Sequence, residues 1–188
     1  MSEPIEKLRR DHKNMWQLLD VIEQEFGRFE SGEMLDFDVV IGALSYCLNY
    51  PTQFHHPTEE AILRVLAERL PAPALSIGDL EEEHEKLVSM TRKLAETVQL
   101  VLGEAEVAKD QLVQMAKEFV ETYRAHIKRE EDAFFDDAES ILRDADWRRI
   151  EAEVADLEDP LAAGQEDGYL DLRKTLVRWS AENQGAAE

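Results

Sequence analysis

Apolar residues recur at intervals of three and four along almost the whole of this 188-residue chain. That spacing places one face of an α-helix in a hydrophobic core. Alternating runs of β-branched residues bounded by turns, which are typical of strands, are nearly absent. The 8 glycines and 6 prolines fall mostly between the periodic segments. The sequence therefore predicts an all-α protein.

Four periodic segments are long enough to be the helices of a bundle, and the connections between them are short. Short connections place consecutive helices side by side and antiparallel. We therefore predict an antiparallel up-down-up-down four-helix bundle over residues 1–143, and a C-terminal helical extension and tail over residues 144–188. In the extension, Tyr169, Leu172, Leu176 and Trp179 have helical spacing and are expected to pack on the bundle exterior. The predicted helices cover residues 4–29, 36–70, 76–102 and 107–142.

The charge of the chain restricts its partners and its location. Asp and Glu number 42 against 21 Lys and Arg, so the net charge is −21 and nucleic acid is an unfavourable partner. No apolar run approaches the roughly 20 residues that cross a bilayer. The N-terminus has no basic stretch followed by an apolar one, and Cys47 is the only cysteine, so no internal disulfide is possible. We expect a cytoplasmic protein without a membrane or nucleic-acid partner.

Each predicted helix turns a histidine toward the core, where the apolar stripe would otherwise continue. Two of these histidines are followed four residues later by a glutamate, which lies on the same helix face one turn away. The core-facing ionisable residues are His12, His55, Glu59, His84, His126 and Glu130. A single histidine on an apolar stripe is more often a hydrogen-bonded core residue than a metal ligand. Four of them, on four helices and with two carboxylates, favour a shared metal site.

Burial of an unpaired carboxylate costs several kcal/mol, so this set of side chains requires a common partner. A pair of metal ions supplies one, and helix bundles build di-iron carboxylate sites from inward-facing Glu and His. Imidazole and carboxylate ligands suit iron, zinc or manganese. The acidic runs 81–83, 130–132 and 136–137 are otherwise expected to be solvated, apart from Glu130.

Because of Pro57, the sequence allows two different pairs of metal ligands on the second predicted helix. It lies between His55 and Glu59, where a proline either kinks a helix or starts a new one. If the helix restarts, His56 and Glu60 become alternatives to His55 and Glu59. The residues two, three and four turns before His55 are apolar (Leu48, Leu44 and Ile41), whereas those one, two and three turns before His56 are polar (Thr52, Asn49 and Ser45). We therefore predict that His55, and not His56, is the ligand.

These motifs resemble the hemerythrin-like, or HHE cation-binding, domain family across roughly residues 5–142. The resemblance implies a four-helix bundle with two non-heme iron ions, bridged by two carboxylates and an oxo or hydroxo group. It makes His12, His55, His84 and His126 terminal ligands, and Glu59 and Glu130 bridging ligands. The matching pieces are Asp11-His12, the segment YPTQFHHPTEE at residues 50–60, Glu83-His84, and HIKREE at residues 126–131.

The sequence differs from the oxygen-carrying hemerythrins, whose third helix has two histidines one turn apart. Here Val88 follows His84 by four residues, and Leu80 precedes it by four. The set of four histidines and two glutamates is more similar to bacterial di-iron proteins of iron-sulfur cluster repair, which carry an additional N-terminal cysteine-bearing domain. We expect two nitrogen ligands and about one open position per metal.

The expected function is to bind oxygen, nitric oxide or peroxide at a di-iron site, for sensing, storage or detoxification. One alternative is an enzyme that reduces nitric oxide, degrades peroxide or repairs iron-sulfur clusters at that site. The other alternative is a metal-free structural bundle, and the sequence leaves open whether the protein is an enzyme.

Overall fold

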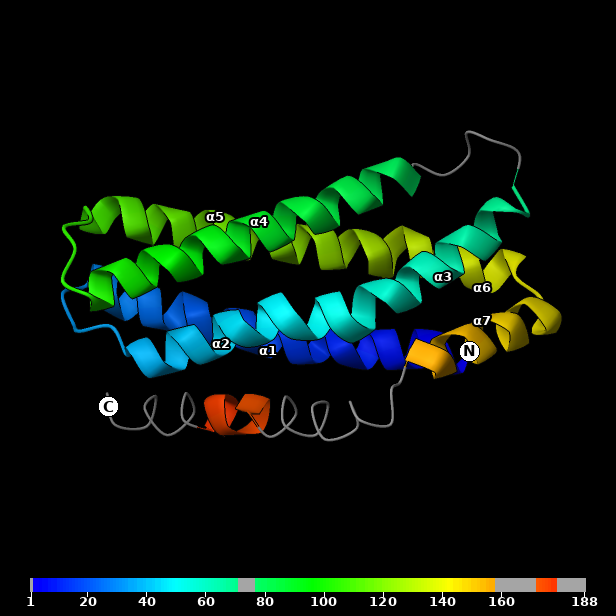
Figure 1. Cartoon of the computed structure of the whole chain (residues 1–188), viewed down its shortest axis with the longest axis horizontal. Helices are drawn as coiled ribbons and strands as arrows, with labels where there is room; N and C mark the ends of the chain where they lie inside the picture. The colour runs from blue at the N-terminus through cyan, green and yellow to red at the C-terminus, as the bar shows by residue number, and fades with distance from the viewer. Residues whose placement is uncertain (1, 71–76, 158–171, 179–188) are drawn as a thin grey trace.

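The computed structural model describes residues 2–70, 77–157 and 172–178. The described residues contain helices and no strand, which confirms the predicted all-α fold. Four rods form an antiparallel bundle, in which α1 contacts α2 and α5, and α4 contacts the same two helices (Figure 1). The elements are α1 (Glu3–Glu30), α2 (Phe37–Tyr50), η1 (Pro51–His55), α3 (His56–Ala67), α4 (Ile77–Leu102), α5 (Lys109–Arg129), η2 (Glu130–Phe134), α6 (Phe135–Ile141) and α7 (Asp144–Leu157).

Two of the four rods contain a π-helical segment that the sequence analysis did not predict. The first rod is α1 and the third is α4. The second rod consists of α2, η1 and α3, and the fourth consists of α5, η2 and α6. A π-helix carries extra residues per turn and so shifts the face that follows it. Both segments lie at the level of the predicted metal ligands.

The turn between α1 and α2 is fixed by local hydrogen bonds. Gly32 has φ +103°, a left-handed conformation that glycine adopts without strain and that ends α1. Asp36 caps α2, because its Oδ1 accepts a hydrogen bond of 3.2 Å from the backbone N–H of Val39. These residues match the predicted break between the first two helices.

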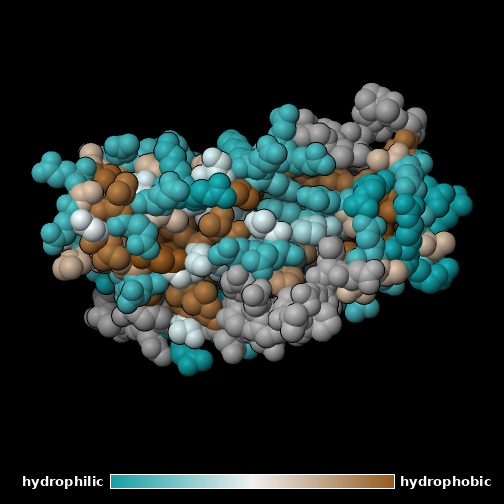
Figure 2. Space-filling model, viewed as in Figure 1, coloured by the Kyte–Doolittle hydropathy of each residue, from teal (hydrophilic) through white to brown (hydrophobic). Residues whose placement is uncertain are grey.

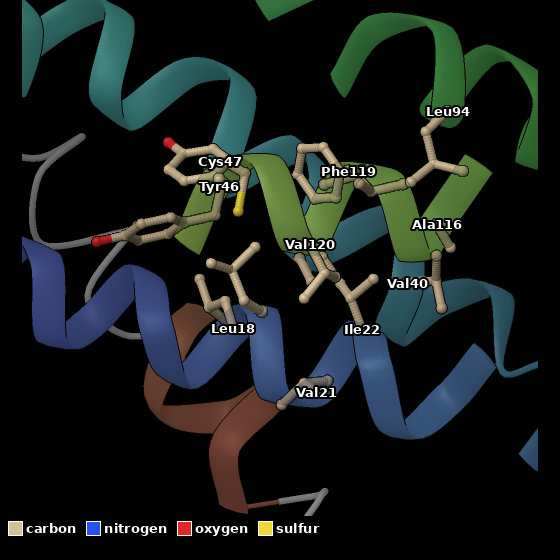
Figure 3. Packing of buried hydrophobic residues seen from close by; sticks show 14 of the residues in the cluster. Leu18, Val21, Ile22, Val40, Tyr46, Cys47, Leu94, Ala116, Phe119 and Val120 are labelled. Carbon is tan, nitrogen blue, oxygen red and sulfur yellow. The ribbon is translucent and has the colours of Figure 1, made fainter. Parts of the chain in front are cut away.

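The apolar core consists of two separate clusters. The large core cluster lies between α1, α2, α4 and α5 and includes Leu18, Ile22 and Phe119 (Figure 3). The small core cluster includes Ile5 and Ile62, together with Ile150 of α7. Helix α7 therefore packs against the end of the bundle at which α1 begins.

Residues 172–178 are helical and pack on α2. A Cβ atom at Gly42 would lie 3.5 Å from Leu172 Cδ1 and 3.5 Å from Leu176 Cδ2. Leu176 belongs to the large core cluster. Tyr169 and Trp179, the other two predicted apolar positions, lie outside the described residues.

Replacement of Gly42 with leucine is expected to destabilise the protein by about 1–3 kcal/mol, because the new side chain collides with Leu172 and Leu176. Gly27→Leu is the matched control, since a Cβ there meets no atom within 4 Å. Both changes remove a helical glycine, so the difference in their free energies of unfolding isolates the collision. Equal stabilities in urea denaturation would show that the C-terminal segment does not pack on α2.

The visible surface contains both hydrophilic and hydrophobic residues. Hydrophilic side chains cover much of the face shown in Figure 2 and separate its hydrophobic patches. None of the helices in the described parts of the chain combines the length and apolar composition that a bilayer crossing requires.

Candidate metal centre

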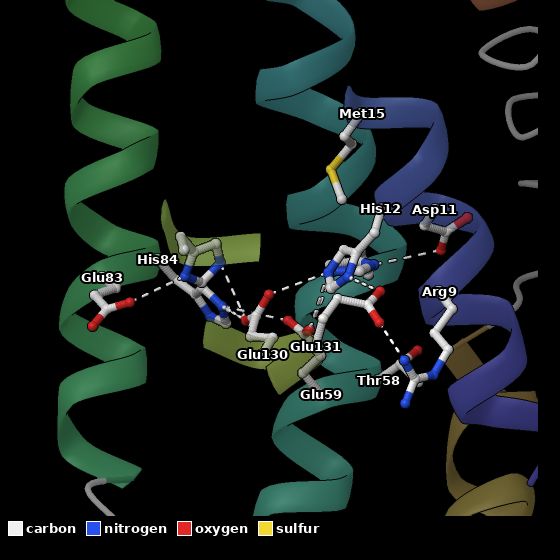
Figure 4. A network of polar contacts seen from close by, with 12 residues as sticks. Arg9, Asp11, His12, Met15, Thr58, Glu59, Glu83, His84, Glu130 and Glu131 are labelled. Atoms are coloured by element: carbon white, nitrogen blue, oxygen red, sulfur yellow. Dashed lines mark hydrogen bonds and ion pairs between the residues drawn. The ribbon is translucent and has the colours of Figure 1, made fainter. Parts of the chain in front are cut away.

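A layer of buried ionisable side chains lies between the two core clusters (Figure 4). It contains all 5 histidines of the chain and two glutamates, and each of the four rods contributes at least one of these residues. None of the seven is more than 7% exposed, and both glutamates are completely buried. The seven residues are His12, His55, His56, Glu59, His84, His126 and Glu130.

The six residues predicted from the sequence come together here, and His56 joins them. The expectation that His56 lies on a polar face is wrong, because its exposure is only 7%. The reason is η1, in which the N–H of His56 bonds to the carbonyl of Pro51, five residues earlier. The extra residue in this turn lets two consecutive histidines reach the bundle interior. Glu60, the alternative to Glu59, is exposed to solvent and is not part of this buried layer.

The potential ligand atoms form two clusters. The first contains His12, His55 and one oxygen of each glutamate, and the second contains the imidazoles of His56, His84 and His126. In the first cluster, the Nε2 atoms of His12 and His55 are 3.1 Å apart. In the second, the rings of His56 and His84 stack with centroids 3.8 Å apart. Within each cluster, the ligand atoms all lie within 4.8 Å of one another.

Each glutamate extends one carboxylate oxygen toward each cluster. Glu59 Oε1 is 3.2 Å from His55 Nε2, and Glu59 Oε2 is 3.4 Å from His84 Nε2. Glu130 Oε2 is 3.1 Å from His12 Nε2, and Glu130 Oε1 is 3.2 Å from His126 Nε2. A carboxylate placed in this way can bridge two metal ions.

The residues present fit a metal ion. Among the described residues, both oxygens of Glu59 and Oε2 of Glu130 are buried and make no well-formed hydrogen bond, although each lies 3.1–3.4 Å from an imidazole Nε2 atom. Buried charged oxygens almost always have a partner, and leaving them without one is costly. A cation between the carboxylates would satisfy them. The imidazole nitrogen and carboxylate oxygen donors suit iron, zinc or manganese.

Three further carboxylates orient the histidines from outside. Each carboxylate accepts a hydrogen bond from the Nδ1 atom of a histidine on another rod. The Nε2 atom of that histidine then faces the centre. The pairs are Glu131 with His12 at 2.9 Å, Glu83 with His126 at 3.1 Å, and Asp11 with His55 at 3.5 Å. Asp11 also accepts a hydrogen bond of 2.8 Å from the Tyr50 hydroxyl, Glu83 pairs with Arg129, and Glu131 pairs with Arg9.

The sequence analysis did not find these outer carboxylates. It expected Glu83 and Glu131 to be solvated, which is wrong, since both are partly buried and hold a histidine. A usable pattern is present, however: each outer carboxylate is the immediate neighbour of a centre residue, in Asp11-His12, Glu83-His84 and Glu130-Glu131. An acid next to an inward-facing residue lies at the side of its helix, where it can contact the adjacent rod.

Comparison with known proteins places the centre in a family. Residues 3–138 match the family model described as the hemerythrin HHE cation binding domain. The chain belongs to the hemerythrin HHE family. Comparisons with curated proteins and with solved structures find no match. The family is defined by cation binding, and the buried His and Glu clusters of this chain are the groups that could hold metal.

In this hemerythrin-family bundle the buried charges alter the pKa values of the histidines. Burial lowers the pKa of His55, but Glu59 and Asp11 outweigh that effect and raise it to about 10. Burial likewise opposes protonation of His84, but Glu130 and Glu59 raise its pKa to about 9. Burial and the neighbouring His84 hold the pKa of His56 well below its usual value. Without metal, protons on His55 and His84 therefore offset the negative charge of the glutamates.

The metal-free protein is expected to lose stability as pH rises. His55 and His84 have folded pKa values of about 10 and about 9, above the ~6.5 of an unfolded histidine. Their stabilisation is complete below about pH 6.5 and disappears as pH rises through the folded values. The melting temperature of chelator-treated protein should therefore fall between about pH 7 and pH 9.5. Metal-loaded protein should change less, because metal replaces the protons. A constant melting temperature for the metal-free protein would contradict this assignment.

Proposed function

We propose that this protein binds about two iron ions and uses them to bind oxygen, nitric oxide or peroxide. The observation that carries the proposal is the pair of imidazole clusters that share two fully buried carboxylates. Redox-active iron supplies the affinity for these small ligands. Related metals, zinc above all, can replace iron in the same ligand set.

The two clusters offer unequal numbers of nitrogen ligands. His12 and His55 provide two imidazoles, whereas His56, His84 and His126 provide three. This proposed division differs from the equal one expected from the sequence, because it includes His56 as a fifth histidine. A six-coordinate metal held by His12 and His55 would keep more of its positions free. We infer that an external ligand binds on the His12 side, since open positions distinguish reactive metal sites from structural ones.

The surroundings of the centre favour small, weakly charged ligands. Leu8 and Leu80 lie one turn from His12 and His84 on one side, and Met15 and Leu87 lie one turn away on the other. All four are buried. An apolar shell of this kind limits access of water and charged metabolites. A metal-free structural bundle is disfavoured because three buried carboxylate oxygens face imidazole nitrogens without well-formed hydrogen bonds.

The proposal is tested by titrating reduced, iron-loaded protein with nitric oxide, oxygen and hydrogen peroxide under anaerobic control. Absorbance and electron paramagnetic resonance should change with at least one ligand. Recovery of the starting spectrum after ligand removal would indicate storage or sensing, whereas formation of a reduced product would indicate an enzyme. Spectra that no ligand alters would contradict the proposal and favour a closed structural site.

A further inference from the structure

The two sides of the centre differ in their hydrogen-bonding capacity. On the side of the small core cluster, the residues one turn from the centre are Leu8, Ile62, Leu80 and Phe134. On the side of the large core cluster, the corresponding buried residues are Met15, Pro51, Leu87 and Tyr123. Of these eight side chains, only that of Tyr123 carries a hydrogen-bond donor. A polar ligand atom would therefore find a donor on the large-core side.

Tyr123 extends from the three-imidazole cluster toward the two-imidazole cluster. It lies on α5 one turn before His126, with the two ring centroids 6.3 Å apart. Its hydroxyl is 3.3 Å from the sulfur of Met15, which lies on α1 one turn after His12. Figure 4 shows Met15 next to His12, on the side away from Arg9. The phenol thus brings its hydroxyl to the rod that carries His12.

The hydrogen bond of Tyr123 is a weak one. A thioether sulfur is a poor acceptor, and a buried hydroxyl normally has a stronger partner. Tyr123 is 2% exposed, so water does not readily supply that partner. Burial, assisted by Cys47 and Glu130, raises the pKa of the phenol well above its usual value, so the proton stays in place. An oxygen or nitrogen atom of a ligand could displace the sulfur at little cost.

We propose that Tyr123 donates a hydrogen bond to the small ligand, which binds on the large-core side of the centre next to His12. This inference rests on the proposed function and adds the side of binding and the residue that stabilises the ligand. It predicts a preference for ligands with a hydrogen-bond acceptor atom, such as nitric oxide or oxygen.

The test compares wild-type protein with Tyr123→Phe, after loading with iron and reduction, using nitric oxide as the probe. Loss of one neutral hydrogen bond should accelerate nitric oxide release about three- to tenfold. The N–O stretching frequency should shift between H₂O and D₂O in wild type but not in Tyr123→Phe. Tyr46→Phe is the matched control: it removes a buried phenol hydroxyl that lies near Tyr123 but nine residues before His55, so it should change release much less than Tyr123→Phe. Iron content and melting temperature verify that each variant is folded and loaded.

A second variant, Met15→Leu, removes the competing sulfur and keeps the hydroxyl, so it should slow nitric oxide release. Equal release rates in wild type, Tyr123→Phe and Met15→Leu, with no solvent isotope shift, would overturn the role of Tyr123 and leave the proposed function intact. Failure of iron-loaded wild type to bind nitric oxide, oxygen or peroxide would overturn both.

Discussion

Glu59→Ala is expected to reduce the bound metal from about two ions per chain to less than one. Two ions held as proposed would both lose a ligand, because Glu59 directs one oxygen to His55 and the other to His84. The change also leaves a cavity beside the imidazoles, with Glu130 as the one remaining glutamate of the centre. Metal content is measured by mass spectrometry after gel filtration without chelator.

Glu60→Ala is the control for this variant. Glu60 is the adjacent carboxylate, is exposed, and should have no effect on metal content. Full metal content in Glu59→Ala, or equal losses in the two variants, would show that Glu59 does not bridge two metals.

His56→Ala is expected to lower metal content about as much as His55→Ala does. The three-imidazole cluster depends on His56, which stacks on His84 and is buried beside His126. From the sequence alone, little effect was expected of His56. The two substitutions act on different clusters, so each should preferentially empty one metal position. Loss of metal in His55→Ala with full retention in His56→Ala would restore the sequence-based assignment.

Hydrophobic periodicity was sufficient to predict the helical rods, because each must bury one apolar stripe against its neighbours. The predicted starts and ends of the first and third rods lie within one residue of α1 and α4. Histidines at positions where an apolar residue was expected also identified the bundle face on which the centre lies. The same reasoning found six of the seven residues in the centre, since each interrupts or continues such a stripe.

The π-helical segments could not be predicted in this way. Consecutive residues of an α-helix lie on different faces. A prediction based on α-helical periodicity therefore allowed only one of His55 and His56 to face the centre. Pro51 and Pro57 enclose η1 and mark a possible irregularity, but η2 contains neither proline nor glycine. The outer carboxylates were missed because their partners are on other rods, and a contact between rods depends on rotation about each helix axis. Composition could not separate Glu83 from its exposed neighbours Glu81 and Glu82.

The central claim is that two metal ions bind between the two core clusters and are bridged by Glu59 and Glu130. It is tested most directly by a crystal structure of iron-loaded protein with anomalous diffraction data at the iron edge. We expect two anomalous peaks, one within bonding distance of His12 and His55 and one within bonding distance of His56, His84 and His126, with both glutamates contacting both peaks. A map without peaks at this centre, from protein shown to be folded and exposed to excess iron, would contradict the account.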